Sequence, residues 1–228
     1  MAKKLSSVVL LSAGLDSSFN LFQAARETDV RLALTFDYGQ RAAARELEKA
    51  EVLARALGVR HQVVSLPWFQ DFTQTALLGK MALPTGGDVQ IDNLEKSQAS
   101  AKAVWVPNRN GIFLNIAAGF AEGLQADLVI PGFNREEAVT FADNSAAFLR
   151  EMDKSLSYST ATKVRVHCYS IDLDKTEIVS KAIPLGVPLK QLWPCYLAGD
   201  KWCGQCESCL RFKRALAANG LSFDLLKE

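Results

Sequence analysis

Short apolar runs alternate along this chain with longer segments in which apolar residues recur every three or four positions. The first run, Val8 to Leu11, is followed by a turn of small residues and then by helical spacing that begins at Asp16. A continuous apolar run is typical of a strand buried on both faces of a sheet, whereas a period near 3.6 indicates an amphipathic helix. The opening of the chain therefore predicts a strand, a tight turn and a helix.

The same alternation continues through the middle of the chain. The pattern predicts further strands at residues 30–36, 60–66, 126–133 and 164–173, and helices at residues 41–57 and 110–124. Strands that alternate with helices predict a parallel sheet covered on both faces, so the expected fold class is α/β, with a doubly wound five-stranded sheet. In such sheets a ligand binds at the carboxyl ends of the strands, beside the first strand.

Residues 67–105 interrupt this scheme. They have no sustained hydrophobic period, and Pro84-Thr85-Gly86-Gly87-Asp88 is a cluster of turn residues. An insertion of this length is usually a lid, an interface or a disordered segment, and the sequence leaves these alternatives open. We expect residues 1–228 to form one domain, because a chain of this length can bury a single sizeable core.

The turn after the first strand has the composition of an anion-binding loop. Ser12-Ala13-Gly14-Leu15-Asp16-Ser17 connects a strand to a helix N-terminus, where backbone N–H groups and the helix dipole favour phosphate oxygens. The alternative is a serine-capped turn without a ligand. The methyl group of Ala13 is tolerated in a phosphate loop if its φ is negative. No Gly-Lys-Ser/Thr sequence is present, which disfavours γ-phosphoryl transfer by a Walker A loop.

Four polar clusters lie at the same predicted edge of the sheet. They are Phe36 to Arg41, Val106 to Asn110, Gly132 to Glu137 and Asp172 to Ile178. Any one alone fits an ordinary solvated turn, but four at the edge that carries the phosphate loop predict a site. Arg109 and Lys175 are the candidate phosphate cations, and Asp16 and Asp37 the candidate partners of Mg²⁺ or ribose.

The C-terminal part of the chain carries the spacing C-x7-C-x2-C-x2-C, formed by Cys195, Cys203, Cys206 and Cys209. Four thiolates within fifteen residues are typical of a closed, tetrahedral structural zinc site. A redox Cys-x-x-Cys pair and simple burial are the alternatives. The excess negative charge of a zinc site would be offset by the basic residues nearby, which are Lys201, Arg211, Lys213 and Arg214.

Charge and hydropathy exclude several classes of function. With 26 Lys and Arg against 25 Asp and Glu the net charge is +1, so we expect no electrostatic grip on nucleic acid. No signal peptide or apolar segment long enough to span a membrane is found. We therefore expect a cytoplasmic protein whose cysteines are thiols or metal ligands rather than disulfides.

The ordered set of motifs resembles the 7-cyano-7-deazaguanine synthase family of N-type ATP pyrophosphatases, over nearly the whole chain. The motifs are the SGGxDS-like loop, FDYGQR at 36–41, VPNRN at 106–110, DKTEI at 174–178 and WPCYLAGDKWCGQCESC at 193–209. The implied fold is the adenine-nucleotide α-hydrolase (HUP-like, Rossmann-like) sheet with a zinc-binding subregion at 190–212. The chain departs from the family at Ala13, where glycine is usual, and at 134–145, which lacks an SGYPDCR-like segment.

The resemblance implies a ligase that forms a C–N bond on the route to queuosine. ATP would activate 7-carboxy-7-deazaguanine, and ammonia would convert it through an amide to the nitrile, with release of AMP and pyrophosphate. No dedicated nucleophile is needed, in agreement with the lack of a Ser-His or Cys-His set. Also implied are Mg²⁺, one structural Zn²⁺ per chain and a homodimer, with no direct nucleic-acid or membrane partner.

The candidate site residues follow from these motifs. Candidates for catalysis are Ser12, Asp16, Ser17, Arg109 and Lys175. Candidates for ATP binding are Leu10, Leu11, Ser12, Ala13, Gly14, Leu15, Asp16, Ser17, Ser18, Phe36 and Asp37. Candidates for substrate binding are Tyr38, Gln40, Arg109, Phe133, Asn134, Glu136 and Glu137. The candidate metal ligands are Cys195, Cys203, Cys206 and Cys209.

Three other functions share parts of this pattern. A paralogue could adenylate the same acid and join it to another amine, such as a protein N-terminus. A tRNA-modifying ATP pyrophosphatase would need an appended RNA-binding domain or further catalytic cysteines, and neither is visible. A zinc-stabilised nucleotide sensor would bind ATP without releasing pyrophosphate.

Overall fold

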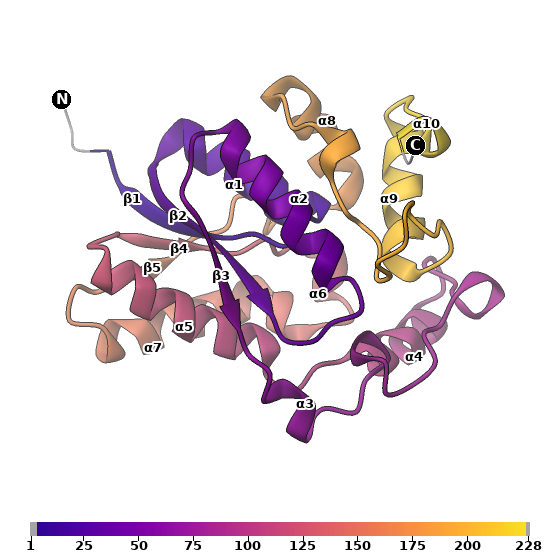
Figure 1. The fold of residues 1–228 in the computed structure, drawn as a ribbon, viewed down its shortest axis with the longest axis horizontal. Coiled ribbons are helices and arrows are strands. Elements are labelled where there is room, and N and C mark those ends of the chain that lie inside the picture. The colour runs from indigo at the N-terminus through magenta and orange to yellow at the C-terminus, as the bar shows by residue number, and fades with distance from the viewer. Residues whose placement is uncertain (1–3, 227–228) are drawn as a thin grey trace.

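The fold is built on a central sheet of five parallel strands in the order β3-β2-β1-β4-β5. The computed structural model describes residues 4–226. The strands are β1 (Ser6–Leu10), β2 (Asp29–Asp37), β3 (His61–Ser65), β4 (Leu128–Ile130) and β5 (Arg165–Val166). The predicted α/β class and five-stranded parallel sheet are confirmed, and β1 lies at the point where the strand order reverses (Figure 1).

Two helical layers cover this sheet. One layer contains α1 (Leu15–Glu27), α2 (Ala43–Ala56), α8 (Lys175–Leu185) and α9 (Glu207–Ala218), and the other α5 (Arg109–Gly123) and α7 (Ala146–Ser159). Figure 1 shows α1 and α2 on one side of the strands and α5 and α7 on the other. Val9 packs into the first layer and its neighbour Val8 into the second, and both are fully buried. This explains the continuous apolar run of the first strand.

Two predicted strands are shorter than expected. β4 ends at Ile130 rather than residue 133, because Pro131 has no N–H to donate to a sheet ladder. β5 contains only Arg165–Val166 instead of residues 164–173. The segment after β5 bonds to side chains instead, since the Oδ1 of Asn20 accepts the N–H of Tyr169 at 2.8 Å.

The segment at residues 67–105 contains short helices, which the sequence pattern did not predict. They are α3 (Phe69–Phe72), the 3₁₀ turns Ala76–Leu78 and Gly86–Asp88, and α4 (Leu94–Val104). Phe69, Leu77 and Val104 are buried in the core that contains α5, so the segment packs onto the domain. Its assignment as a lid or an interface stays a prediction. Among the described residues, no helix is long and apolar enough to cross a membrane.

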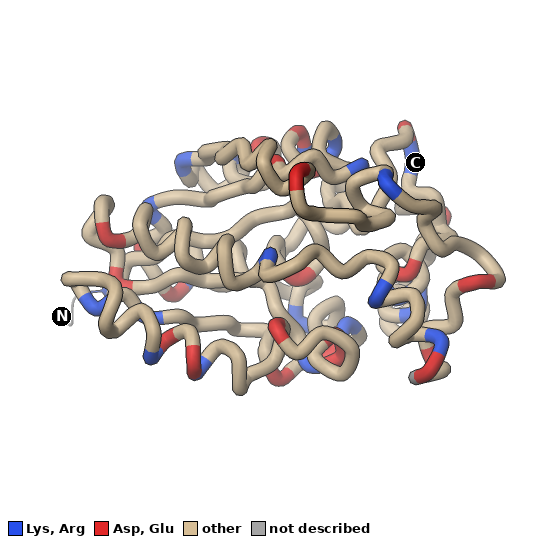
Figure 2. The backbone as a smooth tube through the Cα atoms, turned by 90° about the horizontal axis from the view of Figure 1, so that it is seen from below, with Lys and Arg blue, Asp and Glu red and all other residues tan. Residues whose placement is uncertain are grey.

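The C-terminal part of the chain packs beside α8. A 3₁₀ turn at Leu189–Gln191 leads into the cysteine-rich loop, which is followed by α9 and α10 (Phe223–Leu226). Trp202, Phe212 and Phe223 form an aromatic cluster beneath this loop, with ring centroids between 5.2 and 6.4 Å apart. Acidic and basic residues are interspersed along the backbone in Figure 2, in agreement with a net charge of +1.

Candidate active site

A cavity of about 240 Å³ opens at the carboxyl ends of β1, β2 and β4. Each of the four predicted polar clusters contributes to its wall, through Gln40, Arg109, Glu137 and Lys175. The loop after β1 forms another part of the wall. The expectation that these clusters meet at one edge of the sheet is therefore confirmed.

The predicted loop surrounds the hydroxyl group of Ser17. The backbone N–H of Ser12 donates to Ser17 Oγ at 3.2 Å, and the two serine hydroxyl oxygens are 3.1 Å apart. Ser17 Oγ also donates to the carbonyl of Gly14 at 3.3 Å, and α1 begins directly after Gly14. These hydroxyl groups lie at the positive end of the α1 dipole, where an anion is stabilised.

Ala13 adopts the left-handed conformation, with a φ of 59°. This differs from the negative φ under which its methyl group would be free of strain, and the methyl group is buried away from the cavity. The strain persists because the loop is fixed on both sides. In particular, the Ala13 carbonyl accepts the N–H of Trp193 at 2.8 Å, from the loop that carries the cysteines. Gly14, by contrast, has an ordinary extended conformation.

Gly132 begins one of the predicted polar clusters but was not among the candidate site residues. It follows β4 and lies against the start of α1, where a Cβ atom on Gly132 would be 2.5 Å from the backbone nitrogen of Ser17. Real Cβ atoms do not approach backbone so closely, so only glycine allows this contact. The Pro131-Gly132 pair was visible in the sequence, but its contact with the loop is a tertiary feature.

Lys175 lies between two carboxylates inside the cavity wall. Its Nζ is 2.6 Å from Asp16 Oδ2 and 2.8 Å from Glu137 Oε1, and its side chain is 4% exposed. Burial alone would lower the pKa of Lys175, but the two carboxylates raise it above its usual value, so the side chain stays charged. Burial raises the pKa of Asp16, and Lys175 only partly opposes this. The other oxygen of this carboxylate, Oδ1, is buried without a hydrogen-bond partner.

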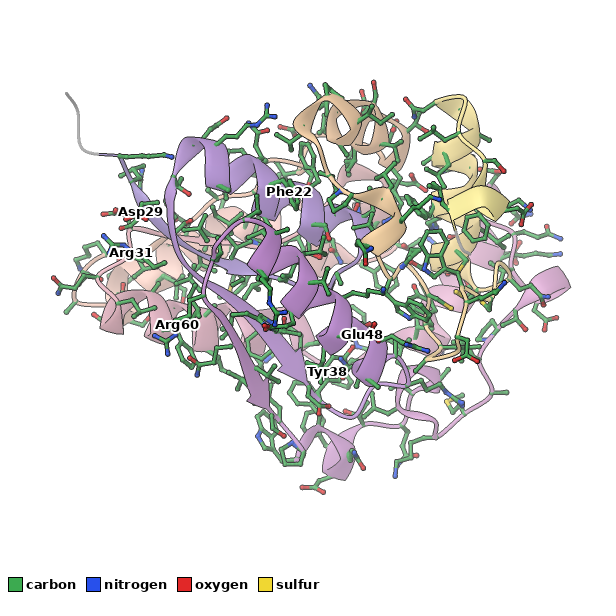
Figure 3. All side chains as sticks on the ribbon, turned by 45° about the horizontal axis from the view of Figure 1, so that its top comes forward. Phe22, Asp29, Arg31, Tyr38, Glu48 and Arg60 are labelled. Atoms are coloured by element: carbon green, nitrogen blue, oxygen red, sulfur yellow. The ribbon has the colours of Figure 1, made fainter. Side chains whose placement is uncertain are left out.

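Arg109 and several aromatic side chains form the opposite part of the wall. Arg109 Nη1 donates to the hydroxyl oxygen of Tyr38 at 3.3 Å, and burial raises the pKa of that phenol. Tyr38 comes directly after β2 (Figure 3). The ring of Phe36 stacks on Phe113 at a centroid distance of 4.1 Å. The sequence pattern predicted the helix that contains Phe113, but Phe113 was not predicted as a site residue.

Gln40 joins β2 to a carboxylate that the sequence analysis also missed. Gln40 Nε2 donates to Glu46 Oε2 at 2.8 Å and to the Phe36 carbonyl at 3.1 Å, and Gln40 Oε1 accepts the N–H of Tyr38 at 3.0 Å. Glu46 is on α2 and lines the cavity. Burial raises the pKa of Glu46 to about 7. Glu46 was not predicted as a site residue, because a glutamate on an amphipathic helix has no distinguishing pattern in the sequence.

Some candidate residues do not line the cavity. Glu136 lies outside it and forms ion pairs with Arg211 and Arg214. The Asn134 side chain caps α6 (Arg135–Ala138) by accepting the N–H of Glu137 at 2.8 Å. Among the candidates for catalysis, ATP binding and substrate binding, those absent from the wall are Ala13, Ser18, Asp37, Asn134 and Glu136.

The four predicted cysteines meet beside this cavity, with their sulfur atoms within 4.8 Å of one another. The N–H groups of Leu197 and Cys203 each point to Cys195 Sγ at 3.4 Å, and those of Gln205 and Cys206 to Cys203 Sγ at 3.4 and 3.3 Å. Such donors stabilise thiolates that bind a metal. The cluster could therefore hold a metal ion, and Cys195 also lines the cavity.

Two of the arginines near the cysteines form ion pairs with carboxylates. Arg211 binds the carboxylates of Glu207 and Glu136 and also donates to Ser97 Oγ at 2.9 Å, while Arg214 binds Glu136 and Asp92. These bonds connect α9 to α4 and α6. The two guanidinium groups thus compensate carboxylates, and their predicted contribution to offsetting the charge of the cysteine cluster stays a prediction.

The parallel sheet, with this small-residue loop between β1 and the start of α1, defines a doubly wound α/β fold with its cavity at the switch point of the sheet. A family described as "Queuosine biosynthesis protein QueC" matches residues 6–220, and the chain belongs to this family. It is 58% identical over 220 residues to a 7-cyano-7-deazaguanine synthase of Bdellovibrio bacteriovorus, covering 96% of this chain and 95% of that protein. The corresponding protein of Pelotomaculum thermopropionicum is 50% identical over 219 residues, with 96% and 99% covered.

The likeness to solved structures concerns the fold alone. The NMN synthetase of Francisella tularensis superposes with a TM-score of 0.50 at 17% sequence identity. The alignment covers 99% of this chain and 81% of that protein.

Proposed function

We propose that this chain converts 7-carboxy-7-deazaguanine, ammonia and ATP into 7-cyano-7-deazaguanine, with release of AMP and pyrophosphate. The observation that carries the proposal is the convergence of the Ser12–Ser17 loop, Lys175 and Arg109 on one cavity. It occurs in a chain that is 58% identical to a protein named for this product. The proposed enzyme class is a ligase that forms a C–N bond.

The chemistry needs little from the protein beyond positioning and charge. A carboxylate is a poor electrophile, so transfer of AMP to its oxygen creates a leaving group and releases pyrophosphate. Ammonia then displaces AMP to give the amide, and a second adenylation of the amide oxygen allows loss of AMP to form the nitrile. The protein must hold the triphosphate, align two planar groups and exclude water from the activated acid.

The cavity wall supplies groups suited to each of these tasks. The N–H and hydroxyl groups at Ser12 and Ser17 would bind the phosphates, and the cations Lys175 and Arg109 would stabilise charge on the leaving pyrophosphate. The unpartnered Oδ1 of Asp16 fits a hard cation, so Asp16 would hold Mg²⁺, which neutralises phosphate charge when bound. Substrate contacts are proposed for Tyr38, Gln40, Arg109, Phe133 and Glu137, which line the same cavity.

We further propose that the cysteine cluster holds one structural zinc ion. Four sulfur donors leave no open coordination position, and the sulfur atoms lie close enough together to share one ion. A homodimer and a cytoplasmic location are proposals that rest on the family resemblance and on the sequence, respectively.

The proposal is tested by incubating the protein with ATP, ammonium and 7-carboxy-7-deazaguanine and weighing the products. We expect the nitrile together with AMP and pyrophosphate. An acyl-adenylate without nitrile would favour the paralogue that uses another amine, and ATP binding without pyrophosphate release would favour the sensor. The relatives of this chain support neither of these two alternatives. They do not support a tRNA-modifying enzyme either.

A further inference from the structure

Formation of the amide from ammonia releases a proton, and a proton acceptor in the cavity would accelerate this step. When the lone pair of ammonia attacks the acyl carbon, the nitrogen becomes positively charged. The nitrogen must lose a proton to give the neutral amide, and loss of that proton in the adduct prevents the return of ammonia, because a neutral amine is a poorer leaving group than an ammonium. A side chain suits this task if its pKa lies near the working pH and it can reach the nitrogen.

Most titratable groups in the cavity wall are unsuited to this role. Asp16 and Glu137 are ion-paired to the same lysine, Lys175, which itself stays protonated. Burial raises the pKa of both Tyr38 and Tyr196, so each phenol stays neutral. No histidine lines the cavity within the described part of the chain.

Glu46 differs from the other two carboxylates in the wall. Its hydrogen-bond partner is the neutral amide of Gln40, and within residues 4–226 no Lys, Arg or His nitrogen lies within salt-bridge distance of it. Burial is the main reason that its pKa reaches about 7. Among the charged groups that face it, Arg109 from α5 lowers this pKa and Asp37 from β2 raises it.

Gln40 fixes the position of this carboxylate. Both ends of the Gln40 amide are used, since its oxygen accepts the Tyr38 N–H and its nitrogen donates to Glu46 and to the Phe36 carbonyl. The amide is therefore anchored to the end of β2, and its donor holds one oxygen of Glu46. The second carboxylate oxygen remains for a proton.

We propose that Glu46 is the general base that accepts the proton from ammonia as it attacks the activated acid. This inference rests on the proposed function. The C–N bond forms with the nitrogen lone pair, the proton moves to a Glu46 oxygen, and AMP leaves with the electrons of the C–O bond. Glu46 then returns the proton to water. In the second round, loss of AMP from the adenylated amide releases a further N–H proton to the same carboxylate.

The test separates adenylation from the steps that need a base. Glu46→Gln keeps the volume and an oxygen that accepts from Gln40. We expect it to retain pyrophosphate exchange with ATP and the deazaguanine acid, while ammonium-dependent amide formation falls by about 10²–10⁴-fold. Glu48→Gln is the matched control, because Glu48 is on the same helix (Figure 3) with its side chain 48% exposed. It should behave as the wild type in both assays.

The pH profile and a second nucleophile give readouts that a purely structural role would not move. Because free ammonia also increases with pH, the rate of amide formation is divided by the concentration of free ammonia at each pH. In the wild type this normalised rate should rise through about pH 7, as Glu46 loses its proton, and the limb should vanish in Glu46→Gln. Glu46→Asp, which keeps a carboxyl group, should retain a limb at a lower rate. Hydroxylamine should restore turnover to Glu46→Gln, since its less basic nitrogen gives an adduct that loses its proton to water.

Two results would overturn the inference. One is an equal loss of pyrophosphate exchange and amide formation in Glu46→Gln, and the other is an unchanged ammonium step. Failure of the proposed function looks different, because the wild type itself would then release no pyrophosphate with the deazaguanine acid.

Discussion

The ammonium group of Lys175 compensates two carboxylates that come from distant parts of the chain. Asp16 lies in the first turn of α1 and Glu137 lies on α6 after β4, and both approach Lys175 at the start of α8. Since the three side chains are largely removed from water, neither carboxylate would stay ionised at low cost without the lysine. One charge therefore serves folding as well as the proposed chemistry.

Removing this charge should destabilise the protein in a pH-dependent way. We expect Lys175→Met to lower the free energy of unfolding by about 3–5 kcal/mol at neutral to alkaline pH. Without the lysine the pKa values of both buried carboxyls rise above their unfolded values, so the folded state binds more protons and stability falls as pH increases. Urea unfolding near pH 5 and near pH 8 measures this. Lys181→Met, on the exposed side of α8, should change stability by no more than about 0.5 kcal/mol.

Replacing Ala13, which has a left-handed backbone conformation, by glycine has opposing effects on the free energy of unfolding. Glycine at this position would relieve about 1–2 kcal/mol of strain. It would also lose about 0.8 kcal/mol from the buried methyl group and about 0.4–1 kcal/mol through the entropy of the unfolded chain. Ala13→Gly should thus keep pyrophosphate release and change stability by less than about 1 kcal/mol. Ala13→Val should destabilise by more than about 2 kcal/mol in the same denaturation assay, since β-branched residues fit positive φ poorly.

At the scale of elements, the segment after β4 restricts the position of the Ser12–Ser17 loop, for which phosphate binding is proposed. The contact between Gly132 and the backbone of Ser17 leaves no room for a side chain. A shift of this loop would displace the N–H groups at the start of α1, which the proposed reaction needs for pyrophosphate.

Gly132→Ala should therefore impair function more than stability. We expect pyrophosphate release to be lost and unfolding free energy to fall by about 1–3 kcal/mol through overpacking. Gly119→Ala is the control, because Gly119 is exposed in the middle of α5 and its added Cβ would meet no atom within 4 Å. The free energy of unfolding of Gly119→Ala should rise by about 0.5–1 kcal/mol. Normal pyrophosphate release in Gly132→Ala would contradict the role given to this contact.

Several elements were predictable because a local pattern determines them. The buried runs at β1 and β2 and the spacing in α2 and α5 gave these elements nearly at their observed bounds. The helix α7 was equally visible, since Leu149, Met152 and Leu156 are its buried residues, but it was not predicted. The length of β5 was overestimated, because an edge strand extends only as far as its partner β4. No local sequence pattern reveals that limit.

The candidate site was predictable only in part, for a related reason. Residues with distinctive chemistry in a recognisable order, such as Lys175 and Arg109, were found from the sequence. Gly132 and Glu46 were not, because their importance comes from what they face in the folded protein. Glu136 resembles a substrate ligand in sequence, yet the arginines that bind it come from α9, about 75 residues away.

At the scale of the whole molecule, the proposed metal site should stabilise the C-terminal region. We expect about one zinc ion per chain, and Cys206→Ser should lose it and lower the thermal midpoint, since a structural metal contributes directly to folding free energy. Cys168→Ser is the control, because Cys168 is buried outside the cluster. Metal analysis with calorimetry checks both variants, and full zinc occupancy in Cys206→Ser would contradict the ligand set.

The bond from the Trp193 N–H to the Ala13 carbonyl has a consequence for synthesis on the ribosome. Domains are made from the N-terminus at about 5–20 residues per second, so the phosphate loop emerges long before the residues that fix it. β1 has a near partner in β2, but its other parallel neighbour, β4, follows more than a hundred positions later. On the proposed function, we expect a nascent or prematurely terminated chain to release no pyrophosphate from ATP until the cysteine-rich loop has left the exit tunnel and folded.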